Sequence, residues 1–168
     1  APRGMEMQRY TPLDQEDLAF IKEYGGRWLE LTGDLIDRKK PSWFMGWRRF
    51  GPATNERSWI TGLIPPYGVG DSYFLFSSVG KTAVEASSFL ACGTSLITDY
   101  VARQKVGGVN QSFFFVQQYP MLEPASFEKA EHARISEIFL ELTYTSHAMR
   151  PWAEDLGYNG APFAFDPD

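Results

Sequence analysis

A chain of 168 residues, of which 43% are hydrophobic and 15% aromatic, can bury a core of its own, and this composition excludes a disordered protein. The single cysteine excludes a disulfide framework and favours a reducing compartment, so we expect a cytoplasmic protein. No apolar run approaches the roughly 20 residues needed to cross a bilayer. The net charge of -5 excludes a protein that coats nucleic acid indiscriminately.

The charges are unevenly distributed along the chain. Residues 38–58 contain one acid, Glu56, and six bases, which gives a local net charge of +5. Residues 123–168 contain nine acids and three bases, which gives a local net charge of -6. One basic face on an acidic body is typical of a site-specific nucleic-acid-binding protein, although ordinary solvated loops give the same pattern.

The first part of the chain predicts one helix and three strands. Residues 13–24 favour a short helix, with Thr11-Pro12 ahead of it and Gly25-Gly26 behind it. Residues 42–50, 58–64 and 71–77 are rich in aromatic and β-branched side chains and predict strands.

The second part predicts two further helical regions and one more strand. Residues 83–104 have apolar side chains at helical spacing, interrupted near Cys92-Gly93 and ended by Gly107-Gly108, which indicates two helical pieces. Residues 112–116, Ser-Phe-Phe-Phe-Val, give the strongest strand signal in the chain. Residues 126–143 predict a helix with Ser126 as its N-cap.

These elements predict a mixed α/β (α+β) fold, in which flanking helices cover a small irregular sheet. We expect one domain over residues 1–168, with residues 123–168 as its acidic helical part and the whole as a fragment of a longer protein.

Two motifs near the middle of the chain suggest chemistry that their residues do not support. Ile64-Pro65-Pro66-Tyr67 differs from the Asn-Pro-Pro-Tyr signature of adenine methyltransferases at its essential position, because Ile64 offers no hydrogen-bond acceptor. Pro65-Pro66 is therefore expected to end a strand. The segment Tyr67-Gly-Val-Gly-Asp71 has only a Gly-x-Gly pattern, which usually marks a turn.

The remaining candidate catalytic residues do not form a constellation. His132 and His147 lack metal-ligand spacing and are expected at the surface. Glu154-Asp155 is expected to be an exposed acidic turn. We therefore predict no catalytic residue, metal site or cofactor site in this chain, and the chain alone is not expected to be an enzyme.

Polar residues concentrate instead in two segments, 53–57 and 102–111. Arginine and lysine side chains pair with guanine, and asparagine and glutamine side chains pair with adenine. The glycines at 107 and 108 would let the backbone approach a phosphate. A cationic helix end followed by a glycine cap explains residues 103–108 equally well. The candidate DNA-binding residues are Lys39, Lys40, Arg48, Arg49, Asn55, Arg57, Arg103, Gln104, Lys105, Gly107, Gly108, Asn110 and Gln111.

Several stretches occur in the order known from one family. They are Arg9-Tyr10, Gly46-Trp47-Arg48, Ala53-Thr-Asn-Glu-Arg57 with residues 60–66, Asp99-Tyr-Val-Ala-Arg-Gln-Lys-Val-Gly-Gly108, residues 113–120, Glu141-Leu-Thr-Tyr-Thr145 and Trp152-Ala-Glu-Asp-Leu-Gly-Tyr158. On these stretches the chain resembles the C-terminal region of large bacterial adenine-N6 DNA methyltransferases from restriction-modification and phage-defence systems, of the type IIG-like and DISARM-like kinds.

The resemblance implies a target-recognition domain. Such a domain would hold double-stranded DNA while a methyltransferase domain of the same parent chain flips and methylates the adenine. S-adenosylmethionine would belong to that catalytic domain, so no cofactor is expected in this chain.

The chemistry of the candidate residues suggests a division of roles. Arg57, Arg103 and Lys105 would hold the DNA backbone or brace the fold. Arg48, Arg49 and the Lys39-Lys40 loop, with Asn110 and Gln111, would include the contacts that select the sequence.

Two alternatives remain open. The acidic C-terminal third would dock the methyltransferase domain or another defence subunit without touching DNA. A weaker alternative is a small independent enzyme with its site at residues 67–71.

Overall fold

The computed structural model describes residues 15–23, 27, 41–76 and 82–165. The chain divides into two compact units, Ala1–Pro41 and Ser42–Asp168, where the sequence predicted a single domain. In the first unit the structure describes helix α1 (Gln15–Glu23), which lies within the predicted range 13–24. The candidate residues Lys39 and Lys40 lie outside the described residues.

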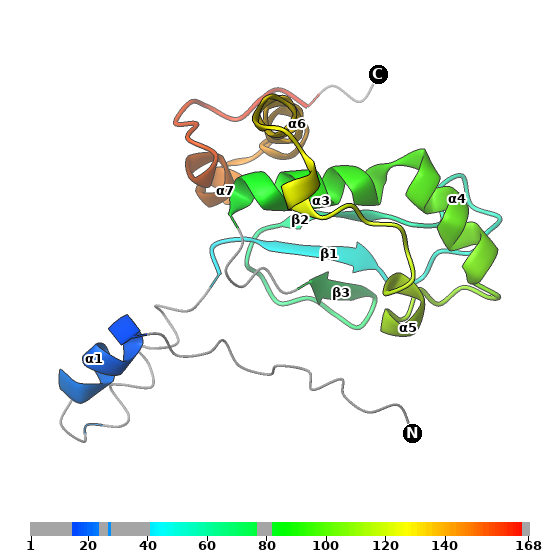
Figure 1. Ribbon diagram of the computed structural model, residues 1–168, viewed down its shortest axis with the longest axis horizontal. Helices are drawn as coiled ribbons and strands as arrows, with labels where there is room; N and C mark the ends of the chain where they lie inside the picture. Colours follow the sequence, from blue (N-terminus) through cyan, green and yellow to red (C-terminus); the bar gives the residue numbers. More distant parts are fainter. Residues whose placement is uncertain (1–14, 24–26, 28–40, 77–81, 166–168) are drawn as a thin grey trace. The chain divides into compact units, whose positions relative to one another are not determined.

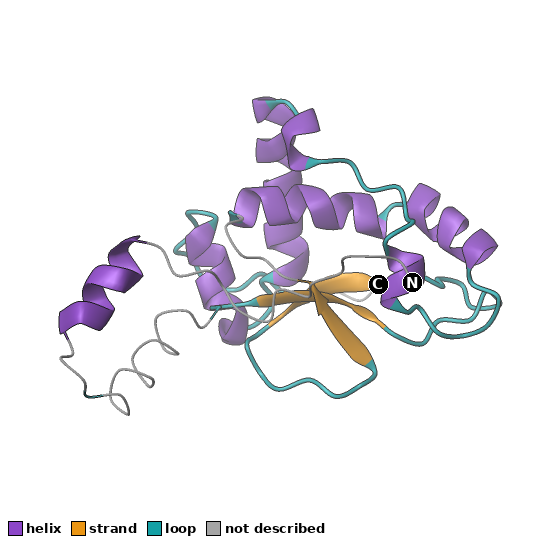
Figure 2. Ribbon diagram, turned by 60° about the horizontal axis from the view of Figure 1, so that its bottom comes forward, coloured by secondary structure: helices purple, strands orange, loops and turns teal. Residues whose placement is uncertain are grey.

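Three short strands form the sheet of the second unit. They are β1 (Phe44–Arg48), β2 (Thr61–Ile64) and β3 (Tyr73–Phe76), and each lies inside its predicted range. The sheet is antiparallel with the order β2-β1-β3, so β1 is the central strand (Figure 1). Figure 2 shows the sheet in orange and the helices that pack against it in purple. Pro65 and Pro66 follow the last residue of β2, as expected for residues that end a strand.

Two helices follow the sheet, α3 (Ala83–Thr94) and α4 (Leu96–Lys105). The predicted interruption is confirmed, but it lies at Ser95, whose hydroxyl accepts a hydrogen bond from the N–H of Thr98 and caps α4. Gly93 stays within α3. A Cβ at this position would lie 2.6 Å from Cγ2 of Thr61, so the glycine permits a close approach to β2 and does not break the helix.

The strand predicted at residues 112–116 is wrong. Phe113–Val116 forms the short helix α5. Helical spacing places Phe113 against Trp47 and buries Val116, while Phe114 between them is 70% exposed. The apolar run therefore has one face on the core and the other in solvent. A strand with a continuous apolar run is instead usually buried on both faces.

The C-terminal part consists of helix α6 (Lys129–Thr143), a single-turn helix η2 (His147–Met149) and helix α7 (Arg150–Asp155). The predicted helix is confirmed, but its predicted N-cap is wrong, because Ser126 belongs to the preceding turn η1 (Pro124–Ser126). Glu128 occupies the N-cap position, and its N–H donates to Oε2 of Glu131 at 2.7 Å.

Side chains alternate across β1, and the odd-numbered ones face the helices. Trp43 and Met45 join a cluster with α3, α6 and α7, in which Leu90 and Trp152 are fully buried. Glu154 and Asp155 are exposed, as expected, but they end helix α7 and do not form a turn, and Asp155 Oδ2 accepts from Nε1 of Trp43 at 2.7 Å. Figure 1 shows α3 along the sheet, with α6 on its far side and α7 beside its first turn.

A second cluster lies at the other end of the sheet, under α4 and α5. It consists of Trp47, Trp59, Ala102, Val106, Val116 and Tyr119. The architecture is thus the mixed α+β fold, with two neighbouring cores on one face of a three-stranded sheet. None of the helices in the described part of the chain is long and apolar enough to cross a membrane.

Candidate nucleic-acid interface

The two segments that carry most of the candidate residues meet in space. Loop 51–58, which connects β1 to β2, lies beside the end of α4 and the segment after it (Figure 1). The N–H of Gly51 donates to the carbonyl of Val109 at 2.8 Å, and the N–H of Gln111 donates to the carbonyl of Arg49 at 2.7 Å. Arg103 joins the two segments directly, because its guanidinium donates to the carbonyls of Ala53 and Glu56.

Asp99 on α4 fixes the end of loop 51–58. The residue is 4% exposed, and its Oδ1 accepts hydrogen bonds from the N–H groups of Ser58 at 2.8 Å and Trp59 at 2.7 Å. Oδ2 accepts from Nε of Arg103 at 2.8 Å. Burial alone would raise the pKa of Asp99, but the hydrogen bonds from Trp59, Arg103 and Ser58 and the positive charge of Arg103 outweigh it and lower the pKa.

Arg103 fixes the middle of the same loop. Its Nη1 donates to the carbonyl of Ala53 at 2.8 Å, and its Nη2 donates to the carbonyl of Glu56. With the bond to Asp99, three of the five guanidinium donors are engaged inside the protein. Arg57 is also engaged, since its Nη2 donates to the carbonyl of Thr94. Both arginines act as braces, one of the two roles that the sequence suggested.

Asn110 and Gln111, two of the residues predicted to select the DNA sequence, are also tied to the protein. Gln111 has no exposed surface, and its Nε2 donates to the carbonyls of Gly51 at 3.0 Å and Ser58 at 3.4 Å. Arg49 Nε donates to Oδ1 of Asn110 at 3.2 Å. A buried amide cannot touch a base edge, so we leave Gln111 out of the contact surface.

Arg49 and Arg48 differ in their surroundings. Arg49 forms an ion pair with Asp71, and its guanidinium carbon lies 5.0 Å from the ring centre of Phe50 and 5.2 Å from that of Phe74. Arg48 ends β1 on the face opposite Trp47, and its Nε and Nη2 are shielded from solvent without a hydrogen-bond partner among the described residues. Neither side chain stands free in solvent, as a recognition arginine would before binding.

Five candidate residues remain exposed where the two segments meet. We call them the rim: Asn55, Gln104, Lys105, Gly107 and Gly108. Lys105 Nζ lies 3.3 Å from Oε1 of Gln118, an exposed contact that a ligand can displace. A Cβ at Gly107 or Gly108 would meet no atom within 4 Å, so both glycines have open space in front of them.

Sequence reasoning missed the residues that organise the rim, Asp99 and Tyr119. The hydroxyl of Tyr119 donates to Oε1 of Gln111. Asp99 stands four residues before Arg103, a spacing that favours an ion pair on one helix face, so this signal was present in the sequence. No sequence signal predicted the contact between Tyr119 and Gln111. The residues between them were predicted as a strand, whereas they form the short helix α5.

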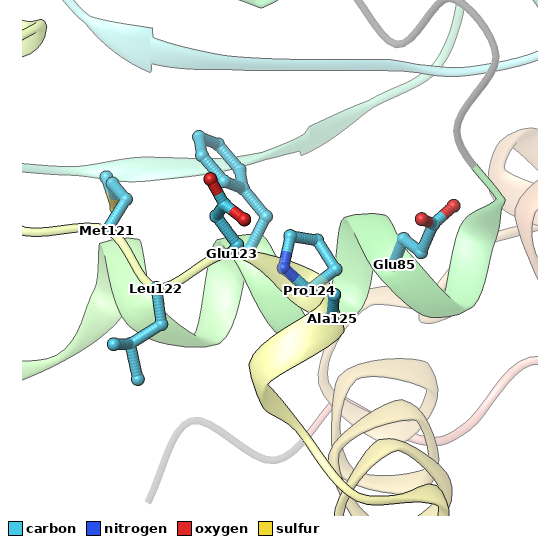
Figure 3. Close-up of a pocket in the computed structure, with 7 residues that line it drawn as sticks. Glu85, Met121, Leu122, Glu123, Pro124 and Ala125 are labelled. Atoms are coloured by element: carbon cyan, nitrogen blue, oxygen red, sulfur yellow. The ribbon is translucent and has the colours of Figure 1, made fainter.

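Other parts of the described chain offer no better site. A hollow of about 450 Å³ between α3 and η1 carries two carboxylates (Figure 3). Glu85, one of them, accepts a hydrogen bond from the N–H of Thr82 at the start of α3 and so serves as a helix cap. His132, expected at the surface, is half-buried with Nδ1 2.6 Å from Oγ of Ser88, whereas His147 is exposed as expected.

Within the described residues, no group of three or more histidine, cysteine, aspartate or glutamate side chains could hold a metal ion. Comparisons with known proteins found no matching family model, no similar curated protein and no similar solved structure. The geometry of the rim and the resemblance of the sequence are therefore the grounds on which a function can be proposed.

Proposed function

We propose that this chain is a target-recognition segment that binds double-stranded DNA for a site-specific adenine-N6 DNA methyltransferase. The catalytic domain and its S-adenosylmethionine site would lie outside these residues. The observation that supports the proposal best is the rim, in which two separate segments are locked together and leave polar residues facing solvent. The sequence resemblance supplies the class of methyltransferase.

The rim has the side chains that DNA recognition needs. The amides of Asn55 and Gln104 can each donate to and accept from the N7 and N6 edge of an adenine. Lys105 supplies a positive charge for a phosphate, and the open space at Gly107 and Gly108 admits a phosphate oxygen close to the backbone. A sequence-specific DNA-binding protein combines contacts to bases with contacts to phosphates.

The hydrogen bonds of Asp99 and Arg103 order the rim before DNA binds. Asp99 and Arg103 hold loop 51–58 at both its middle and its end, so little further ordering is required when Asn55 meets a base. The same bonds imply that Arg57 and Arg103 contribute little phosphate attraction. We therefore expect a modest salt dependence, set mainly by Lys105.

Lys105 is the one charged side chain of the rim. We expect Lys105→Ala to weaken binding to all duplexes about equally and to reduce the slope of log affinity against log salt concentration by about 1, because one phosphate contact is lost. Fluorescence anisotropy with labelled duplexes of varied sequence, from low to moderate salt, measures both quantities. Arg134→Ala is the control, since Arg134 is an exposed base on α6 whose ion pair with Glu137 lies on the protein surface. Absence of any salt-dependent binding by the unaltered chain would rule out the proposed function.

A second candidate function is docking of the methyltransferase domain or another defence subunit. It is favoured by three apolar side chains on the solvent face of α4, Leu96, Ile97 and Tyr100, which are 76%, 72% and 63% exposed. Adjoining exposed apolar side chains of this size often mark a contact with another protein surface. If the chain binds the methyltransferase domain and never binds duplex, this function replaces the first.

A further inference from the structure

We propose that Tyr119 is a positioning residue for the rim: its hydroxyl orients the buried Gln111, which holds both ends of loop 51–58. The inference rests on the proposed function, because it concerns how the DNA-contact surface keeps its shape. Tyr119 itself is 6% exposed and lies outside that surface.

Gln111 connects more segments than any single brace described above. Its side chain donates to the carbonyls of Gly51 and Ser58, the first and last residues of loop 51–58. Its main-chain N–H donates to the carbonyl of Arg49 at 2.7 Å, and its carbonyl accepts from Nε1 of Trp47 at 2.7 Å. Position 111 therefore ties the loop to the end of the central strand.

The orientation of the Gln111 amide depends on Tyr119. Two carbonyl oxygens on the loop side require the amide nitrogen there, which turns Oε1 towards Tyr119. The Tyr119 hydroxyl donates to that oxygen. Burial, and after it the negative charge of Asp99, raises the pKa of Tyr119 to about 12, so the phenol keeps its proton and remains a donor.

Removal of the hydroxyl alone isolates this role. In Tyr119→Phe the ring can keep its edge-to-face contact with Trp59, whose ring centre lies 4.9 Å away. The Oε1 atom of Gln111 would then be buried without a partner, which favours rotation of the amide and loosens both ends of the loop. No phosphate contact is removed, so the salt dependence should stay the same.

The experiment compares Tyr119→Phe with Tyr144→Phe in the full chain, at a temperature where circular dichroism shows both variants folded. Tyr144 is 1% exposed in the other cluster, and its hydroxyl donates to the carbonyl of Gly160 at 3.3 Å, so the control removes the same group far from the rim. We expect Tyr119→Phe to weaken duplex binding about fivefold with an unchanged salt slope, and Tyr144→Phe to leave binding unaltered.

Hydrogen exchange gives a second measurement that needs no DNA. The N–H groups of Ser58 and Trp59 should exchange about tenfold faster in Tyr119→Phe than in Tyr144→Phe, because the loop opens more often. Equal exchange in the two variants overturns the positioning role, whether or not the unaltered chain binds duplex. Faster exchange in Tyr119→Phe with duplex affinity retained also overturns it, since the rim would then not depend on the loop. If the unaltered chain binds no duplex, the proposed function fails, and the exchange measurement still decides whether Tyr119 positions the loop.

Discussion

Asp99→Ala should lower the free energy of unfolding by about 3 kcal/mol, one of the two largest effects expected for a single substitution in this chain. The change leaves the buried N–H groups of Ser58 and Trp59 without an acceptor. It also deprives Arg103 of its carboxylate, 2.8 Å away. Urea denaturation followed by tryptophan fluorescence measures the loss, because Trp59 lies directly beside the broken hydrogen bonds.

Asp99→Asn is the matched control for this prediction. Asparagine keeps an oxygen that can accept from both N–H groups, but it places an NH2 donor where Oδ2 accepts from Arg103, so both the charge and that hydrogen bond are lost. We expect a loss of about 1 kcal/mol, clearly smaller than for alanine. Equal losses for the two variants would mean that the ion pair, and not the pair of main-chain hydrogen bonds, fixes the loop.

The same carboxylate makes stability depend on pH in acid. Since the pKa of Asp99 is lowered in the folded protein, the unfolded chain binds this proton more readily. The stabilisation is present above the unfolded pKa of about 4 and is lost as the pH falls through the folded pKa. Melting temperatures measured between pH 7 and pH 3 should therefore fall less steeply for Asp99→Asn than for the unaltered chain. Parallel curves would contradict this role for Asp99.

The sequence predicted most of the fold because its signals are local. Each of the three strands lies where aromatic and β-branched residues concentrate, and α3, α4 and α6 follow helical spacing. The error at Phe113–Val116 has a tertiary cause. The run packs one side onto Trp47 and leaves Phe114 in solvent, an arrangement that composition does not encode.

The candidate site was predicted in place but only partly in role. Basic and amide side chains near residues 55 and 105 suggested DNA contacts, and three of them, Asn55, Gln104 and Lys105, are exposed at the rim. Gln111 has the same chemistry as Gln104, yet it is fully buried, because the bridge between Phe50 and Asn110 draws position 111 under the loop. Distinguishing the two glutamines requires this long-range pairing, which no local pattern shows.

Gly46→Ala should be at least as damaging as Asp99→Ala, with a loss of about 3 kcal/mol or more, because the sheet has no room for a methyl group there. A Cβ at position 46 would lie 2.1 Å from the main-chain carbonyl oxygen of Phe74 and 2.6 Å from Cε1 of Tyr73. The tyrosine cannot move aside freely, since its hydroxyl donates to the carbonyl of Gly62 at 3.0 Å and holds the ring against the sheet. The carbonyl belongs to the neighbouring strand, so relief would require β1 and β3 to separate.

Gly62 provides a close control, because it stands opposite Gly46 in the register of β1 and β2. A Cβ at position 62 would meet no atom within 4 Å, so Gly62→Ala should change stability by less than about 1 kcal/mol. Thermal melts of both variants followed by circular dichroism should show a fall of about 10 °C for Gly46→Ala and little change for Gly62→Ala. Since Gly46 immediately precedes Trp47, whose indole donates to the carbonyl of Gln111, separation of β1 from β3 should also release the segment that anchors the rim. Similar melting temperatures for the two variants would contradict the close packing of β1 against β3 and, with it, this route from the sheet to the rim.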